Sequence, residues 1–175
     1  MSAPENLLDV YVDELRDLWS ANDQMQACLQ KLVDEASDEK LRTALEESVD
    51  GIGEHTEKLK MLVEANGGET EKEHCRGMEG LVKEAHKHVI EDGSDDENLV
   101  DIEIISQYQR MSHYGLAGFG TAAAYARALG LEDDETMLSS IVEDIYKADE
   151  MTSLLAERLE ETALAAEDTE EGEAD

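Results

Sequence analysis

Apolar residues recur at alternating steps of three and four along four long stretches, and this spacing constrains the fold more than any other feature. Such steps keep the apolar side chains on one face of an α-helix. The chain has one Pro, one Phe and no alternating β-branched run bounded by turns, so strands are not expected. The spacing predicts an all-α protein with helices over about residues 2–32, 37–66, 97–129 and 133–166.

The predicted helix ends follow from local residue types. Ser2, Pro4 and Glu5 form the pattern of a capping box with Pro in the first turn. Ser37 is a suitable N-cap for the second helix, and Gly67 and Gly68 are suitable terminators. The turn before Ser37 is very short, which makes the first two helices antiparallel neighbours.

The two helix pairs are joined by residues 69–98, which contain a weaker helical pattern over about 73–91. Two helix pairs linked by one long crossover are typical of the ferritin-like antiparallel four-helix bundle. We therefore expect a bundle over residues 1–166, with an extra short helix in the crossover. Residues 167–175 contain mostly acids and are expected to form a disordered acidic tail.

The charge is extreme, with 45 acidic and 14 basic residues and a formal net charge of −31. This charge disfavours nucleic acid and anionic membrane surfaces as partners, because both would be repelled. The acids are spread over every segment. A surface adapted to high salt is therefore favoured over the alternative, a local binding face for cations or basic partners.

Neither a signal peptide nor an apolar stretch long enough to span a membrane is apparent, so we expect a cytoplasmic protein. Cys28 and Cys75 do not form a disulfide framework or a metal-binding pattern and are expected to be free thiols. Motifs for a catalytic nucleophile or a phosphate-binding loop are also lacking. We therefore do not expect an enzyme.

Four stretches resemble the YciF-type ferritin-like family (YciE/YciF-type), a stress-associated group. They are residues 37–41, 75–81, 109–121 and 129–130, and the similarity spans about residues 5–160 in the same order. The resemblance implies a ferritin-like fold and a homodimer. Together with the acidity, it suggests a member of halophilic-archaeal type.

The resemblance also implies a di-iron or di-manganese centre in mid-bundle, built from Glu and Glu-x-x-His ligands on facing helices. The aligned positions carry no carboxylate here: they are Asn22, Ser48, Gly51, Ser112, Gly115 and Ile145. Neutral and apolar side chains cannot offset the charge of two buried cations. We therefore predict that the family's di-metal site has been lost and that no cofactor is bound.

The leading hypothesis is a metal-free, degenerate ferritin-like bundle with a structural or interaction role and an unidentified protein partner. The alternative is a redox or metal-binding protein that holds iron or manganese with displaced ligands, drawn from Glu54, His55, His113 and Asp149. The small-residue run 115–124 has two open interpretations, tight packing within the chain or a dimer face.

Overall fold

The computed structural model describes the backbone of residues 3–68 and 73–173, with side chains up to residue 165. Its elements are α1 (Leu7–Glu35), α2 (Glu39–Ala65), α3 (Arg76–Ala85), the π-helical turn η1 (His86–Glu91), α4 (Glu97–Leu129) and α5 (Glu132–Glu173). This described part contains no strand. The predicted all-α fold is confirmed.

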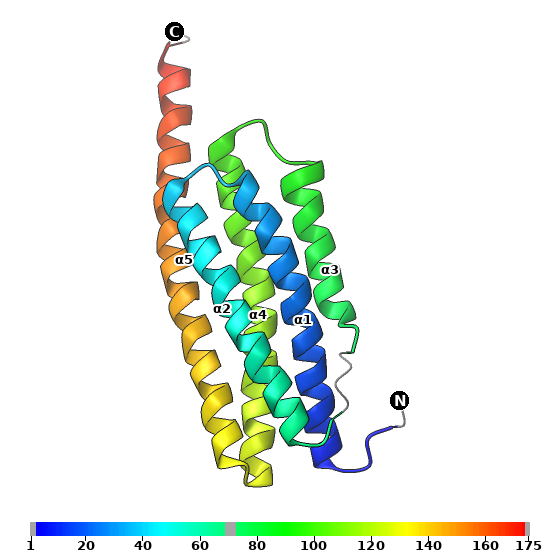
Figure 1. The fold of residues 1–175 in the computed structure, drawn as a ribbon. Helices are drawn as coiled ribbons and strands as arrows, with labels where there is room; N and C mark the ends of the chain where they lie inside the picture. The colour runs from blue at the N-terminus through cyan, green and yellow to red at the C-terminus, as the bar shows by residue number, and fades with distance from the viewer. Residues whose placement is uncertain (1–2, 69–72, 174–175) are drawn as a thin grey trace.

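Four of the helices form an antiparallel bundle (Figure 1). α1 packs beside α2, α4 beside α5, and α1 also contacts α4, while the contact between α2 and α5 is sparse. The crossover helix α3 lies on the outside of the bundle, against α1 and α4 (Figure 1). This arrangement matches the predicted ferritin-like bundle with an extra short helix in the crossover.

The start of α1 differs from the sequence prediction. Its N-cap is Asn6, whose Oδ1 accepts a hydrogen bond from the Asp9 backbone N–H at 3.0 Å. Asp9 in turn accepts one from the Glu5 N–H at 2.8 Å. Asn6 and Asp9 thus supply the reciprocal caps that the sequence predicts for Ser2 and Glu5. The side chain of each accepts a hydrogen bond from a backbone N–H at the start of the helix. Ser2 lies outside the described residues.

The ends of the other long helices follow the prediction to different degrees. α2 is capped by Asp38, one residue after the predicted Ser37, and α4 ends at Gly130 in the left-handed region at φ 75°, as predicted. α5 continues to Glu173, which corrects the predicted end at 166 and the disordered tail from 167. Ala and Glu favour helix strongly enough to extend it, and its last turns project beyond the bundle (Figure 1).

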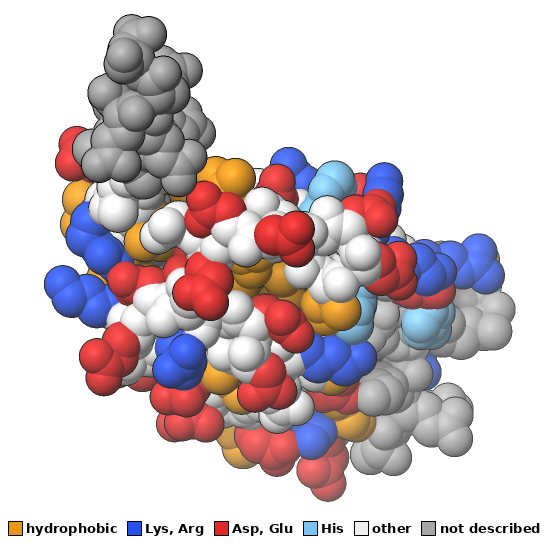
Figure 2. All heavy atoms as spheres, turned by 90° about the horizontal axis from the view of Figure 1, so that it is seen from above, with side chains coloured by type: hydrophobic (Ala, Val, Ile, Leu, Met, Phe, Trp, Pro, Cys, Tyr) orange, Lys and Arg blue, Asp and Glu red, His pale blue; other side chains and the backbone are white. Residues whose placement is uncertain are grey.

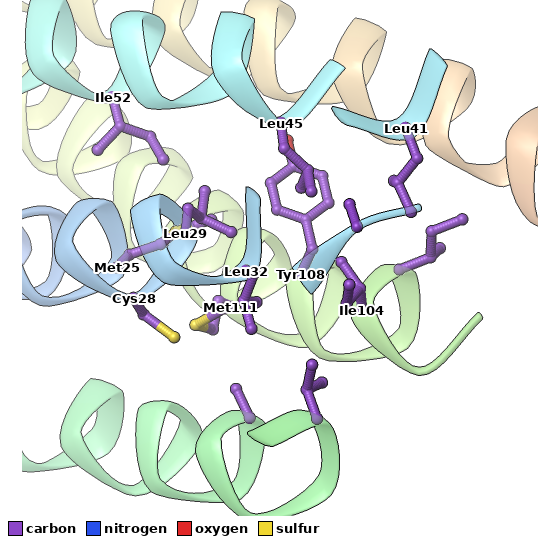
Figure 3. Packing of buried hydrophobic residues seen from close by; sticks show 14 of the residues in the cluster. Met25, Cys28, Leu29, Leu32, Leu41, Leu45, Ile52, Ile104, Tyr108 and Met111 are labelled. Carbon is purple, nitrogen blue, oxygen red and sulfur yellow. The ribbon is translucent and has the colours of Figure 1, made fainter. Parts of the chain in front are cut away.

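The buried apolar residues form two clusters, one toward each end of the bundle. The cluster near the α1–α2 turn includes Leu29, Leu32, Leu41, Leu45 and Ile104 (Figure 3). The other cluster is built around Tyr11, Leu15, Leu18, Leu62 and Leu138. The middle of the bundle lies between these two clusters.

The buried surface of α4 is broad. Its half-buried residues include Ile102, Gln109 and Leu116. The fully buried ones are Asp101, Ile104, Ile105, Gln107, Tyr108, Met111, Ser112, Gly115, Phe119, Ala122, Ala123 and Ala126. The reason is that α4 contacts α1, α3 and α5, so more than one of its faces is covered.

A buried carboxylate ties the α1–α2 turn to α4. Asp101 is 1% exposed. Its oxygens accept hydrogen bonds from the Ser37 N–H at 2.8 Å, the Ser37 hydroxyl at 2.6 Å and the Asp38 N–H at 2.9 Å. Ser37 therefore anchors the turn to another helix instead of capping its own. Charge-assisted hydrogen bonds of this kind are stronger than neutral ones.

We expect Asp101→Asn to lower the free energy of unfolding by about 2 kcal/mol, because an NH₂ group would face backbone donors that a carboxylate now satisfies. Urea denaturation at pH 7 measures the change. Glu103→Gln, at a half-exposed position on the same helix, is the matched control and should change stability by less than about 0.5 kcal/mol. Equal effects of the two variants would contradict the proposed role of Asp101.

Candidate functional site

A cavity of about 250 Å³ lies in the middle of the bundle, between the two apolar clusters. Met25 and Ile52 of one cluster and Phe119 and Ile145 of the other contribute to its walls. The exposed lining residues belong to α2 and α5, so the cavity opens to solvent between these two sparsely packed helices.

The structure brings all six predicted degenerate positions to this one cavity, from all four bundle helices. They are Asn22 on α1, Ser48 and Gly51 on α2, Ser112 and Gly115 on α4, and Ile145 on α5. These six positions therefore lie at a common level of the bundle.

The hydroxyl groups at this level are engaged with neighbouring groups of the protein. Ser48 Oγ donates to the Ala44 carbonyl at 2.8 Å and lies 3.0 Å from the Tyr108 hydroxyl. Ser112 Oγ donates to the Tyr108 carbonyl at 3.0 Å. Asn22 is different, because its Nδ2 has no hydrogen-bond partner in the described part of the chain, although the residue is only 5% exposed.

The donor set of the cavity does not fit a dinuclear metal centre. Its inner positions offer neutral amide and hydroxyl groups, and Ile145 offers only hydrocarbon. Across residues 3–68 and 73–165, no group of three or more His, Cys, Asp or Glu side chains is placed to hold a metal ion. Hard divalent cations require anionic oxygen or imidazole ligands, which this layer does not supply.

The rim of the cavity carries the charged groups. Glu47, Glu54 and Asp144 are exposed there, and His55 is buried beside them. Burial lowers the pKa of His55, as does the nearby Lys58, while Asp144 acts in the opposite direction. The His55 Nε2 lies 3.8 Å from the Asp144 carboxylate, and its ring meets Phe119 edge-on at 6.2 Å between centroids. His55 is therefore an uncharged wall residue at neutral pH.

The four predicted displaced ligands do not come together. Glu54 and His55 line the central cavity, whereas His113 and Asp149 line a separate groove on α4 and α5. His113 Nε2 lies 3.1 Å from Asp149 Oδ1, and the His113 side chain is 58% exposed. This pair is a surface contact and cannot share a metal ion with Glu54 and His55.

A polar chain that the sequence analysis did not identify joins the crossover to the bundle. The Cys75 thiol lies 3.0 Å from the Tyr114 hydroxyl, which donates to Asp17 at 3.0 Å. Cys75 also caps α3, since its Sγ accepts from the Met78 N–H at 3.4 Å. Burial raises the pKa of Cys75, so the group is a thiol at neutral pH.

Comparison with known proteins identifies the family. A family model described as a domain of unknown function, DUF892, matches residues 6–165. Protein YciF of Escherichia coli strain K12 is 33% identical over 138 residues, which is 78% of this chain and 81% of that protein. The chain belongs to the DUF892 family.

Solved structures of similar proteins show the same fold. The E. coli stress protein YciF superposes with a TM-score of 0.83 at 29% identity, covering 89% of this chain and 98% of that one. YcfI of Rhodopseudomonas palustris, provisionally described as a structural protein, gives 0.80 at 25% identity, covering 85% and 94%. A Xanthomonas campestris protein at 14% identity gives 0.72, covering 95% and 99%, and supports the fold alone.

The stretches that carry the family resemblance have structural roles in this DUF892 member. Ser37 binds Asp101, Cys75 caps α3, and Gly130 ends α4. Gly77 allows the Tyr114 ring to approach α3, because a Cβ on Gly77 would lie 2.7 Å from Tyr114 Cε2. The resemblance is thus carried by helix ends and contacts between helices.

We expect Gly77→Ala to destabilise the protein by about 1–3 kcal/mol, because Tyr114 is held by Cys75 and Asp17 and cannot yield freely. Gly80→Ala on the same helix is the control. A Cβ there meets no atom within 4 Å, so this variant should be neutral or more stable by about 0.5–1 kcal/mol. Thermal denaturation followed by circular dichroism compares the stability of the two variants. A neutral Gly77→Ala would show that Tyr114 does not constrain α3.

Proposed function

We propose that the protein is a metal-free ferritin-like bundle with a structural or interaction role in a stress response. The observation that carries this proposal is the central cavity, where neutral or apolar side chains stand at all six positions aligned with the metal-binding layer. The E. coli relative is described as a stress protein, and the Rhodopseudomonas relative provisionally as a structural protein. Both descriptions support this reading.

The central layer is electrostatically unfavourable for metal ions. Two divalent cations in this layer would lose most of their hydration, with a penalty of at least several kcal/mol per ion, and neutral amide and hydroxyl oxygens would not offset it. The acids at the rim are exposed to solvent and lie on α2 and α5 only, so they do not encircle the cavity. The alternative with displaced ligands loses support because its four residues occupy two separate places.

Protein purified from cells supplemented with iron or manganese should contain far fewer than the roughly two metal atoms per chain of a dinuclear bundle. Elemental analysis by plasma mass spectrometry measures the content. The positive control is the combined variant Asn22→Glu, Gly51→Glu, Ser112→Glu and Ile145→Glu, which restores acids to the layer and should take up metal. About two tightly bound iron or manganese atoms per wild-type chain would refute the proposal.

The acidic residues lie almost entirely at the surface. Asp101 is the only buried carboxylate among the residues whose side chains are described. Acidic side chains are spread over the face shown in Figure 2, with fewer basic side chains between them. None of the described helices is long and apolar enough to cross a membrane. We propose that this surface adapts the protein to a cytoplasm of high salt content.

The melting temperature should rise by about 10 °C between roughly 0.1 M and 2 M potassium chloride, because screening relieves repulsion among the surface carboxylates. Differential scanning calorimetry measures this rise. A melting temperature that is constant across the salt series would argue against adaptation to high salt.

We also propose a homodimer, formed through the outer face of α5. Tyr146, Leu154 and Leu164 are each about 60% exposed, and they fall within about 80° around the helix axis at 100° per residue. Part of the small-residue run on α4 packs within the chain, whereas Ala117, Gly120 and Ala124 of the same run are exposed. A Cβ on Gly118 would lie 2.5 Å from Leu18 Cδ2, and Ala122 and Ala123 are buried.

Sedimentation equilibrium in molar salt should give a dimer mass at micromolar concentration. Leu154→Glu should weaken the dimer at least tenfold, because it places a charge in an apolar contact. Met61→Glu is the control, since Met61 is a similarly exposed apolar residue on α2 and not on α5. A monomeric wild-type protein, or dissociation by both variants alike, would rule out this interface.

A further inference from the structure

The central cavity has the composition of a site for a small organic molecule. Its walls are formed mainly by hydrocarbon and aromatic groups, including Met25, Ile52, Phe119 and Ile145. Small residues keep the space open, since a Cβ on Gly51 would meet no atom within 4 Å and one on Gly115 only makes contacts at 3.9 Å or more. Sites for small molecules are typically concave and apolar, with few polar groups.

Asn22 supplies the polar group. Its side chain lines the cavity, it is 95% buried, and its Nδ2 has no hydrogen-bond partner in the described part of the chain. A buried donor without a partner is unfavourable, so a ligand that accepts its hydrogen bond gains that interaction. The last torsion angle of Asn is broad, which allows the amide to turn toward an acceptor.

The rim selects the charge of the ligand. Glu47, Glu54 and Asp144 stand exposed at the opening, and His55 is uncharged at neutral pH because burial lowers its pKa. No Lys or Arg lines the cavity. An anionic ligand such as a carboxylate would therefore meet repulsion at the entrance and find no cation inside.

We propose that this cavity binds a small uncharged aromatic molecule with one hydrogen-bond acceptor oxygen, whose acceptor is held by Asn22. The size agrees, because a dry cavity of about 150 Å³ accepts benzene and this one measures about 250 Å³. A single ring with a short carbonyl-bearing substituent therefore fits. The inference rests on the proposed absence of metal from the same layer.

The test uses three probes of equal heavy-atom count: acetophenone, cumene and benzoate. They share a phenyl ring, but cumene lacks the acceptor and benzoate is an anion. Binding is followed by the methyl signals of Met25, Met151, Ile52 and Ile145, which all line the cavity. Acetophenone should shift these signals in a saturable manner, and benzoate should bind at least tenfold more weakly.

Two variants test the contacts. Asn22→Leu should lower the ratio of acetophenone affinity to cumene affinity about tenfold, because it removes the donor but leaves a side chain of similar size. Gly51→Leu should fill the cavity and abolish binding of both neutral probes. Gly120→Leu is its matched control, since a Cβ there also meets no atom within 4 Å and the residue does not line the cavity. Circular dichroism establishes that each variant is folded.

The proposal is overturned if saturating acetophenone leaves the cavity methyl signals unchanged, or if Asn22→Leu leaves the affinity ratio unchanged. It is also overturned if Gly51→Leu binds as the wild type does. All titrations are run with and without EDTA. Loss of binding on chelation would implicate a metal and overturn the proposed function as well, whereas absence of binding in both conditions would overturn only the ligand proposal.

Discussion

Two separate apolar clusters hold the bundle together, so its stability does not depend on close packing in the layer between them. Leu29, Leu32 and Leu41 close one end, while Tyr11, Leu15 and Leu62 close the other. Each cluster draws side chains from several helices, so the four helices are fixed at both ends. The inner positions of the middle layer can then carry small or neutral residues such as Gly51, Ser112 and Gly115, and a cavity persists there.

The charged side chains lie almost entirely at the surface of the bundle. Asp101, the one buried carboxylate among the described side chains, accepts hydrogen bonds from three donors and links the α1–α2 turn to α4. The other acids whose side chains are described stand at least partly in solvent. The large net charge therefore acts over the surface, where water and salt moderate it, and the interior remains nearly neutral.

The helices and their order could be predicted because the apolar spacing is long and regular, and Gly130 marked the end of α4 to the residue. Features that depend on contacts between helices could not. Ser37 was assigned to a local cap because the sequence does not show that Asp101 lies beside it. Cys75 gave no signal as a cap, since its role requires the path of the crossover chain.

The candidate site shows the same limit. The residues of the central layer, from Asn22 to Ile145, could be assigned to one level of the bundle from the sequence, and all of them line the cavity. Whether that layer would be filled or hollow depends on rotamers and helix separation, which the sequence does not specify. His113 and His55 were both candidates for displaced ligands, although His113 lines another groove.

Acidic residues have opposite effects on helix stability at the two ends of α5. Glu132, Asp133, Asp134 and Glu135 occupy the first turn of α5, where the positive end of the helix dipole favours them, and the last turn has no basic residue. Acids near the C-terminus oppose the dipole, and the final turns project past the bundle without a neighbouring helix (Figure 1). The charges of the first turn therefore stabilise α5 at its beginning, whereas no basic residue compensates the dipole at its end.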